Sequence, residues 1–202
     1  MKKYELTAET KKIFGRTLYR IKALRDIRED IKAGDLGGWI EKESNLSHDG
    51  DAWVCGNAWV CGNAEVYGNA WVCGNAEVYG HAKVCGNAKV YGHAEVYGNA
   101  WVCDNAKVCG NAEVCGNAWV CGNAEVTEIT DVFAVSPIGS RNDTTTFYKA
   151  KGGKIFVKCG CKNTDIDTWL GMVQATHGDN KHAKAYRLAA QIAKLQILGE
   201  EE

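Results

Sequence analysis

Between residues 50 and 127 the chain repeats one six-residue formula thirteen times, from Gly50-Asp51-Ala52-Trp53-Val54-Cys55 to Gly122-Asn123-Ala124-Glu125-Val126-Thr127. The shared pattern is Gly-Asn-Ala-x-Val-(Cys/Tyr), where x is Trp, Glu or Lys. A short fixed period is the signature of a solenoid, in which each coil packs on its neighbours. Two looser units, Gly38–Glu43 and Ser44–Asp49, extend the run at its start.

The order of residue types within each unit predicts a short strand followed by a corner. Ala-x-Val alternates as a strand does, so Ala and Val point to one side and x to the other. Gly-Asn can form the corner, because both residues tolerate a positive φ better than others do. Three corners complete one coil of 18 residues, so the thirteen units form a little over four triangular coils. At the usual spacing of stacked strands the prism is about 20 Å long.

The pattern resembles the left-handed parallel β-helix of hexapeptide-repeat proteins, over residues 38–127. In that family an aliphatic residue points inward, as Val54 and Val60 would here, and a small residue follows four positions later, as Ala58 and Ala64 would. The left-handed sense is what the resemblance implies, since general crossover rules favour the right hand. The expected fold is therefore mainly β, with a solenoid between two different ends.

Residues 18 apart should stack on one flat face, which places the variable residues in three outward ladders. The first ladder is Trp53, Trp71, Lys89, Lys107 and Glu125; the second is Trp59, Glu77, Glu95 and Glu113; the third is Glu65, Lys83, Trp101 and Trp119. Outward apolar patches usually mark interfaces, in which aromatic residues are favoured. We therefore expect a homo-oligomer, most simply a trimer as in many hexapeptide solenoids, with the interface on Trp53, Trp59, Trp71, Trp101 and Trp119. A foreign partner, or simple drift within a duplicated repeat, is the alternative.

The cysteines and the glutamate column are interpreted as structural. Eight of the ten cysteines occupy the last position of a repeat unit, where tyrosine and threonine also occur, so we expect reduced packing groups. A ladder presents its sulfurs in a row, whereas zinc needs tetrahedral convergence, so no metal and no cofactor are predicted. The stacked glutamates 77, 95 and 113 could meet a cation or a basic partner, although solvation with splayed side chains is the simpler expectation.

The alternative function is an acyltransferase-like enzyme, since many hexapeptide-repeat proteins use a histidine between subunits. His81 and His93 are the only histidines in the regular repeat, and both replace Asn at a corner. They fall on different corners, and no inserted loop interrupts the units to form a pocket, so no catalytic residue is assigned. An ice-binding solenoid would need repeated threonines on a flat face, which these ladders lack.

The two ends follow different patterns. Residues 1–37 are expected to form a β-rich cap, since Arg16–Leu24 alternates and an open solenoid end would otherwise invite aggregation. Residues 128–202 are expected to form an α+β module with short strands at 132–135, 144–148 and 154–158. A helix with Ile166 on its apolar face should end at Gly178, and a second, capped by Asp179, should run to about Leu198.

The C-terminal module contains the candidate ligand-binding residues. The stretch from Ser140 to Thr146 is rich in hydroxyl groups and includes Arg141, which would suit a phosphate or a carboxylate. Cys161 and His177 come from a second group of polar residues further along, in which Cys-x-Cys is a poor zinc motif. The predicted ligand-binding residues are Ser140, Arg141, Thr144, Thr146, Cys161 and His177, and a small phosphorylated ligand is one candidate.

A second resemblance covers nearly the whole chain. The segments at 32–40, 45–47, 145–148, 159–161 and 176–180, together with the repeat, look like hexapeptide-repeat proteins of phages and prophages, which have no settled activity. The outward ladders and the unrepeated C-terminal part lead us to expect a non-enzymatic, self-associating scaffold that binds a small ligand or a host protein through the C-terminal module or grooves between subunits. The resemblance adds only the phage context, in which a host protein would be the partner. The charged start and the lack of a long apolar stretch predict a cytoplasmic protein without membrane contact. No block is basic enough to predict nucleic-acid binding.

Overall fold

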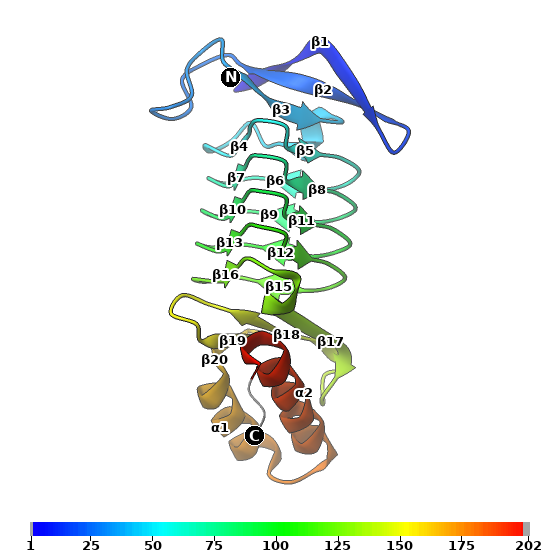
Figure 1. Cartoon of the computed structure of the whole chain (residues 1–202), viewed down its shortest axis with the longest axis vertical. Helices are drawn as coiled ribbons and strands as arrows, with labels where there is room; N and C mark the ends of the chain where they lie inside the picture. Colours follow the sequence, from blue (N-terminus) through cyan, green and yellow to red (C-terminus); the bar gives the residue numbers. More distant parts are fainter. Residues whose placement is uncertain (1, 200–202) are drawn as a thin grey trace.

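The structure is a computed structural model that describes residues 2–199. Its parts follow one another along a single long axis, from an N-terminal group of strands through a column of stacked coils to a sheet with two helices (Figure 1). The N-terminal strands and the two C-terminal helices therefore lie at opposite ends of the molecule. The expected order of cap, solenoid and α+β module is confirmed.

The N-terminal strands continue one face of the solenoid. β1 (Tyr4–Ile13) and β2 (Arg16–Ala23) form an antiparallel hairpin, and β2 pairs antiparallel with β3 (Leu36–Ile40). β3 then pairs in parallel with the first strand of a solenoid face, with Trp39 opposite Trp59. A seven-stranded sheet results, so the cap is joined to the solenoid by backbone hydrogen bonds.

The cap buries residues from both faces of β2. Ile21 enters the solenoid core, while Leu18 packs on the outside against Trp59. The two side chains lie on opposite faces of β2, as the alternation along Arg16–Leu24 predicts. Leu18 and Ile21 are both fully buried.

Thirteen two-residue strands form the three faces of the solenoid, each made of the variable residue and the valine of a unit. They are β4 (Trp53–Val54), β5 (Trp59–Val60), β6 (Glu65–Val66), β7 (Trp71–Val72), β8 (Glu77–Val78), β9 (Lys83–Val84), β10 (Lys89–Val90), β11 (Glu95–Val96), β12 (Trp101–Val102), β13 (Lys107–Val108), β14 (Glu113–Val114), β15 (Trp119–Val120) and β16 (Glu125–Val126). All pair in parallel with partners 18 residues away, as in Trp101 opposite Trp119 and Glu95 opposite Glu113. The three predicted ladders are confirmed.

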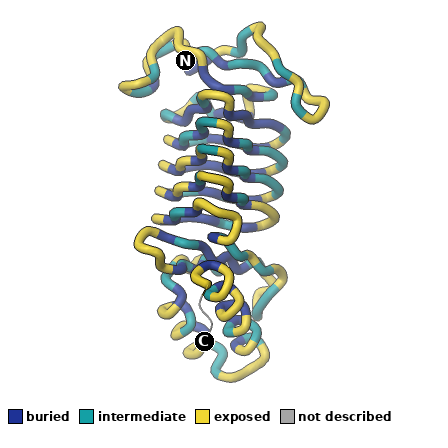
Figure 2. The backbone as a smooth tube through the Cα atoms, in the orientation of Figure 1, coloured by how far each residue is buried: buried dark blue, intermediate teal, exposed yellow. Residues whose placement is uncertain are grey.

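The interior of the solenoid contains the valines and alanines of the repeat, almost all with no exposed surface. Figure 2 shows this as buried segments inside each coil with exposed corners between them. The corner glycines have φ between 63° and 75°, a region that residues with a Cβ rarely adopt. Asp104 occupies one of these corner positions with a φ of 59°.

The hydrogen bonds between coils in which at least one partner lies outside a two-residue strand all run in one direction. The N–H of Cys55 donates to the carbonyl of Val72, and the N–H of Cys73 donates to that of Val90, at 2.8 and 2.9 Å. Through these bonds each coil donates N–H groups to the next coil along the chain. The first coil is left with carbonyls that lack a preceding coil, and the last coil with N–H groups that lack a following one.

The C-terminal module is an antiparallel sheet with two helices on its far side. After a short 3-10 turn at Ile129–Asp131, β17 (Val132–Ile138), β18 (Asp143–Lys149), β19 (Ile155–Cys159) and β20 (Lys162–Asp165) pair in chain order. The first two were predicted in shorter form and the third one residue too early, whereas the fourth is polar and was not predicted. α1 (Ile166–His177) and α2 (Lys181–Leu198) follow as expected, but Asn180 rather than Asp179 caps α2.

The C-terminal sheet lies between the last coil and the helices. Tyr148 of β18 joins the solenoid core, while its neighbour Phe147 packs with Trp169 and the two helices. The side chains of β18 therefore alternate between the two sides. Residues that face the solenoid are separated by the sheet from residues that face the helices.

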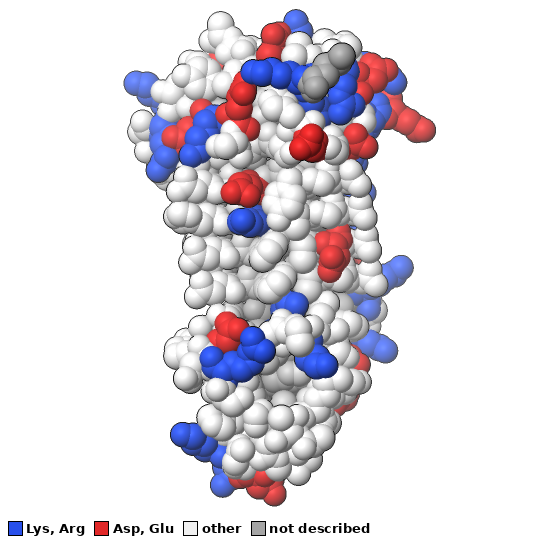
Figure 3. All heavy atoms as spheres, turned by 180° about the vertical axis from the view of Figure 1, so that it is seen from behind, with Lys and Arg blue, Asp and Glu red and all other residues white. Residues whose placement is uncertain are grey.

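Charged side chains gather at the ends of the molecule. Figure 3 shows mixed positive and negative groups over the N-terminal strands and a second set near the C-terminal module, with a largely uncharged surface over the coils of that face. Within residues 2–199 no helix has the length and apolar character needed to cross a membrane.

Candidate functional site

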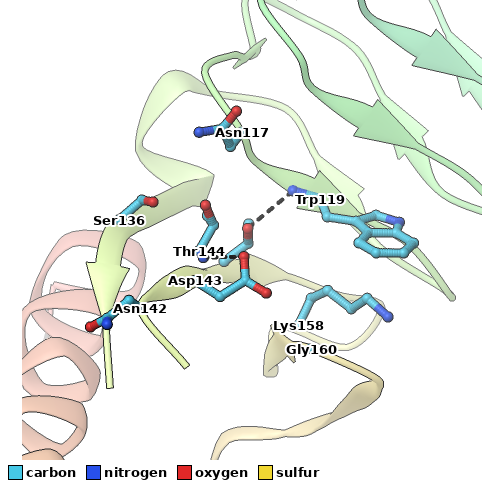
Figure 4. Close-up of a pocket in the computed structure, with 9 residues that line it drawn as sticks. Asn117, Trp119, Ser136, Asn142, Asp143, Thr144, Lys158 and Gly160 are labelled. Carbon is cyan, nitrogen blue, oxygen red and sulfur yellow. Dashed lines mark hydrogen bonds between the residues drawn. The ribbon is translucent and has the colours of Figure 1, made fainter. Parts of the chain in front are cut away.

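A cavity lies where the last coil meets the C-terminal sheet. It has a volume of about 410 Å³ and a lining that is mostly polar (Figure 4). The residues that line it are Asn117, Trp119, Ser136, Asn142, Asp143, Thr144, Thr146, Lys158 and Gly160. We call this cavity the junction pocket, because the solenoid supplies Asn117 and Trp119 while the C-terminal sheet and its turns supply the rest.

One wall of the junction pocket is fixed by a bond between the two parts. The hydroxyl of Thr146, which is buried on β18, accepts a hydrogen bond from the backbone N–H of Trp119 at 3.0 Å. In earlier coils the equivalent N–H donates to an alanine carbonyl of the next coil, as Trp101 does to Ala118. Thr146 therefore supplies the acceptor that a further coil would have provided for the Trp119 N–H.

Trp119 is held on both faces. Its ring stacks on that of Trp101 with centroids 4.7 Å apart and an interplanar angle of 8°, and the Lys158 ammonium lies 3.9 Å from its centroid. A cation over an indole face at this distance is attracted by the ring quadrupole. Lys158 is thereby positioned beside the pocket with its charge available to a bound anion.

The turn between β17 and β18 supplies the polar rim. Asn142 has a φ of 49°, a conformation that Asn adopts more readily than most residues, and Asp143 accepts a hydrogen bond from the N–H of Thr144 at 2.7 Å. Amide, hydroxyl and carboxylate groups of this turn thus belong to the residues that line the pocket. These groups can bind a ligand that both donates and accepts hydrogen bonds.

The structure divides the six residues predicted to bind a ligand. Thr144 and Thr146 line the junction pocket, and Arg141 lies at its edge, where its guanidinium packs against Gly160. Ser140 is exposed in the turn before β18, and Cys161 is exposed in the turn before β20. His177 lies on the helical side of the sheet, with its ring 5.9 Å from those of His182 and Tyr186. The six residues do not form one site.

The pocket residues that the sequence did not indicate come from separate segments. Asn117 is a corner residue identical in type to its repeats, and Ser136 and Lys158 lie in strands with no motif around them. The signal that could have found Asn142 and Asp143 is their place in the same hydroxyl-rich turn. Lys158 could be placed only once its strand was known to face Trp119.

The five tryptophans predicted to form an interface have different environments. Trp53 is fully buried beneath the N-terminal strands, and Trp59 is 4% exposed, stacked on Tyr79 and covered by Phe14. The prediction of an outward interface is wrong for these two residues, because the cap folds over the first coil. Trp71 lies half-buried under the guanidinium of Arg28 at 4.9 Å, and only the stacked Trp101 and Trp119 remain part of an open face.

The glutamate column is stabilised by aromatic donors rather than by solvation alone. The hydroxyl of Tyr79 donates to Glu95 at 3.0 Å, and that of Tyr97 donates to Glu113 at 3.1 Å. Burial, followed by the charge of Glu95, raises the pKa of Glu77 above its ordinary value. Each of these tyrosines thus donates a hydrogen bond to a carboxylate of the neighbouring coil. These bonds offset part of the repulsion between the stacked carboxylates.

The third face contains a column of sulfurs that receives indole hydrogen bonds. Trp101 Nε1 donates to Cys85 Sγ and Trp119 Nε1 donates to Cys103 Sγ, both at 3.2 Å. The last member, Cys121, lies 3.6 Å from the hydroxyl of Tyr148. A hydrogen bond from Cys103 lowers the pKa of the Cys121 thiol to about 7 despite its burial, and the same bond raises the pKa of Cys103 to about 11.

The two histidines of the repeat are exposed at separate corners, as predicted. Neither lines the junction pocket. Their backbone N–H groups continue the hydrogen bonds between coils, to Gly98 in the case of His81 and Gly110 in the case of His93. Both residues therefore continue the repeat in the same way as the asparagines they replace.

The fold defines the chain as a parallel β-solenoid with a folded cap at each end. Comparison with known proteins gives no matching family and no curated relative for this chain. Any statement about its function therefore depends on the geometry of the junction pocket and on the surfaces around it.

Proposed function

We propose that this protein is a non-enzymatic, self-associating scaffold that binds a small polar ligand in the junction pocket. One observation carries the proposal. Amide, hydroxyl, carboxylate and ammonium groups from the solenoid and from the C-terminal sheet line the same cavity. Ligand sites commonly combine a concave surface with a few well-placed polar groups. The rigid solenoid would serve as the support for this site.

The chemistry of the pocket favours a small phosphorylated molecule that also carries hydroxyl groups. Lys158 supplies a positive charge, and the amides of Asn117 and Asn142 can donate to phosphate oxygens. Asp143 supplies an acceptor for ligand hydroxyls, and Arg141 lies at the edge against Gly160. A ligand without a negative charge would leave Lys158 paired only with the indole.

Self-association is the second part of the proposal. The exposed side of α2 carries Leu188, Ile192 and Leu195, which are 61%, 51% and 52% exposed. Their i, i+4, i+7 spacing forms one apolar stripe, which suits packing against the same stripe of other copies of the chain. The resemblance to hexapeptide solenoids, which commonly pack as trimers, favours a trimer, and the resemblance to phage proteins favours an accessory role in which a host protein is the eventual partner.

The acyltransferase alternative gains no supporting observation. His81 and His93 are exposed on different corners, and the junction pocket contains neither of them. The pocket also lacks any histidine or cysteine among the residues that line it. A general base within hydrogen-bonding reach of a bound acceptor is what such an enzyme would require.

Ligand binding is tested with a thermal-shift panel of nucleotides, sugar phosphates and the corresponding unphosphorylated compounds. We expect a phosphorylated compound to raise the melting temperature of the wild type, and Lys158→Gln and Asn142→Ala to remove most of that shift. Lys162→Gln is the matched control, since Lys162 is exposed on β20 outside the pocket. A shift that persists in both pocket variants, or no shift with any compound, would contradict the proposed site.

Self-association is tested by light scattering at micromolar concentration. Leu188→Glu places a charge in the stripe and should reduce the measured mass toward that of a single chain. Met172→Glu is the control, because Met172 is exposed on α1 outside the stripe. A monomeric wild type would refute this part of the proposal without affecting the ligand test.

A further inference from the structure

One corner of the solenoid departs from the repeat. The first position of the unit is glycine in twelve of the thirteen units, and Asp104 is the exception. Its φ of 59° lies near those of the corner glycines, so the backbone follows the same path with a carboxylate added. Asp is one of the few residues with a side chain that adopt this conformation readily.

The added carboxylate lies beside two thiols of the third face. The sulfurs of Cys103 and Cys121 and a carboxylate oxygen of Asp104 all lie within 4.8 Å of one another. Cys121 is buried, Cys103 is half-buried and Asp104 is exposed, so the group is reachable from solvent on the side of Asp104. The repeat predicts a flat row of sulfurs, and the carboxylate of Asp104 lies to one side of that row.

We propose that Cys103, Asp104 and Cys121 form a binding site for a soft divalent cation of the zinc type. Two thiolates and one carboxylate are a ligand set that zinc accepts, with a solvent molecule in the fourth position. Tetrahedral coordination at ordinary zinc distances needs ligand atoms about 3.6 to 3.8 Å apart. Ligand atoms already within 4.8 Å reach that separation by small side-chain rotations.

Neighbouring groups hold these side chains in place. The N–H of Gly122 donates to Asp104 Oδ2 at 3.0 Å, which fixes the carboxylate and leaves its other oxygen open. The indole N–H of Trp119 donates to Cys103 Sγ, an interaction that also stabilises a thiolate. Hydrogen bonds of this kind orient the ligands in metal sites.

Other stacked cysteines of the solenoid provide the comparison. Cys55 and Cys73 are related by the same 18-residue step on the first face, but the corner residues that follow them are Gly56 and Gly74. Among residues 2–199, Cys103, Asp104 and Cys121 are the one group of three such ligands close enough to hold an ion. The position of Asp104, rather than the number of cysteines, therefore marks the site.

The test is a titration of the reduced full-length chain with Zn²⁺, and with Co²⁺ as a spectroscopic probe. We expect one equivalent to bind, with release of thiol protons and a thiolate-to-cobalt charge-transfer absorption. Asp104→Gly restores the repeat formula and should fold normally while its affinity for either ion falls at least tenfold. Cys121→Ser should remove most of the charge-transfer absorption.

Cys73→Ser is the matched control, since it removes a stacked thiol that is followed by Gly74 instead of an aspartate. It should leave the affinity and the stoichiometry of metal binding unchanged. Equal affinity in Asp104→Gly and the wild type would overturn the proposal, because binding would then depend on thiols alone. No binding, or a loss in Cys73→Ser equal to that in Cys121→Ser, would overturn it too. Asp104→Asn keeps the corner conformation and separates loss of a ligand from any change of backbone.

Discussion

The two ends of the solenoid present opposite hydrogen-bonding problems, and each is closed by groups of the matching kind. At the N-terminal end the first coils have free carbonyls, and the side chains of Lys3 and Asn45 donate to them. At the C-terminal end the free groups are N–H donors, and Thr146 accepts from Trp119 while Asp131 accepts from Thr127. The direction of the bonds between coils thus dictates which residue types can cap each end.

The two caps also differ in how they attach. The N-terminal strands join a solenoid face edge to edge through β3, whereas the C-terminal sheet lies across the last coil and contributes Tyr148 to its core. The crosswise sheet leaves the junction pocket between itself and the last coil. A cap of the second kind closes the solenoid and forms a site at the same time.

The largest expected effect comes from reversing the polarity of the N-terminal cap. Asn45 is fully buried and donates from Nδ2 to the carbonyls of Gly62 and Ala64 at 3.2 and 2.8 Å. Asn45→Asp keeps the shape but places acceptors against acceptors, so we expect a loss of about 3 kcal/mol of unfolding free energy. Urea denaturation measures it, and Asn57→Asp at an exposed corner is the control, expected to change stability by less than about 0.5 kcal/mol.

A second effect at the same end appears in alkaline solution. Burial lowers the pKa of Lys3 from 10.5 to about 8 in the folded protein. The unfolded chain therefore binds a proton that the folded chain has lost between pH 8 and 10.5, so stability due to this group rises with pH across that window. The unfolding free energy of the wild type should therefore rise by about 2 kcal/mol relative to that of Lys3→Met between pH 8 and 10.5. A flat difference would show that Lys3 is solvated.

The C-terminal end should respond to acid instead. Burial of Asp131 raises its pKa, but the bonds from Thr127, Lys149 and Glu128 outweigh it and hold the pKa below its ordinary value. Its contribution is thus fully present above about pH 4 and is lost as the pH falls through the lowered pKa. Asp131→Asn should cost about 1.5 kcal/mol at pH 7, and the difference from wild type should disappear toward pH 2.

The smallest effect should come from the C-terminal cap bond beside the pocket. Thr146→Val removes the acceptor for the Trp119 N–H at nearly constant volume. We expect a loss of about 1 kcal/mol, since water in the junction pocket can partly replace the hydroxyl. Hydrogen exchange of the Trp119 amide should accelerate in this variant and stay unchanged in Thr144→Val, whose side chain accepts no such bond. Equal protection in both variants would refute the cap assignment.

The sequence was sufficient to predict the coil of the repeat and the pairing of its strands. Gly, Ala and Val at fixed positions determine the coil, so the pairing of Trp101 with Trp119 and of Glu77 with Glu95 was predicted correctly. The ladder positions did not reveal exposure, since Trp53 and Trp59 are covered by strands whose docking depends on contacts made only in the folded chain. Local alternation correctly placed Leu18 and Ile21 on opposite faces of their strand, but it did not reveal that Leu18 is buried against Trp59.

The candidate site was only partly predictable for the same reason. The turn containing Thr144 could be identified from its polar composition, but Lys158 and Asn117 join it only through tertiary packing. Cys161 and His177 were predicted as a second polar group of the same module, and the sheet separates His177 from the pocket. Asp104 was visible as the one break in the glycine column, and its closeness to Cys121 followed from the 18-residue coil.

The step of 18 residues between stacked strands has a consequence for how this molecule can change in length. Removing or duplicating three consecutive units shifts the C-terminal sheet along the axis by one coil and keeps its orientation relative to the N-terminal strands. Removing or duplicating a single unit rotates it by one face of the prism instead. The number of units therefore determines both the distance between the two ends and the rotation of one end relative to the other about the long axis.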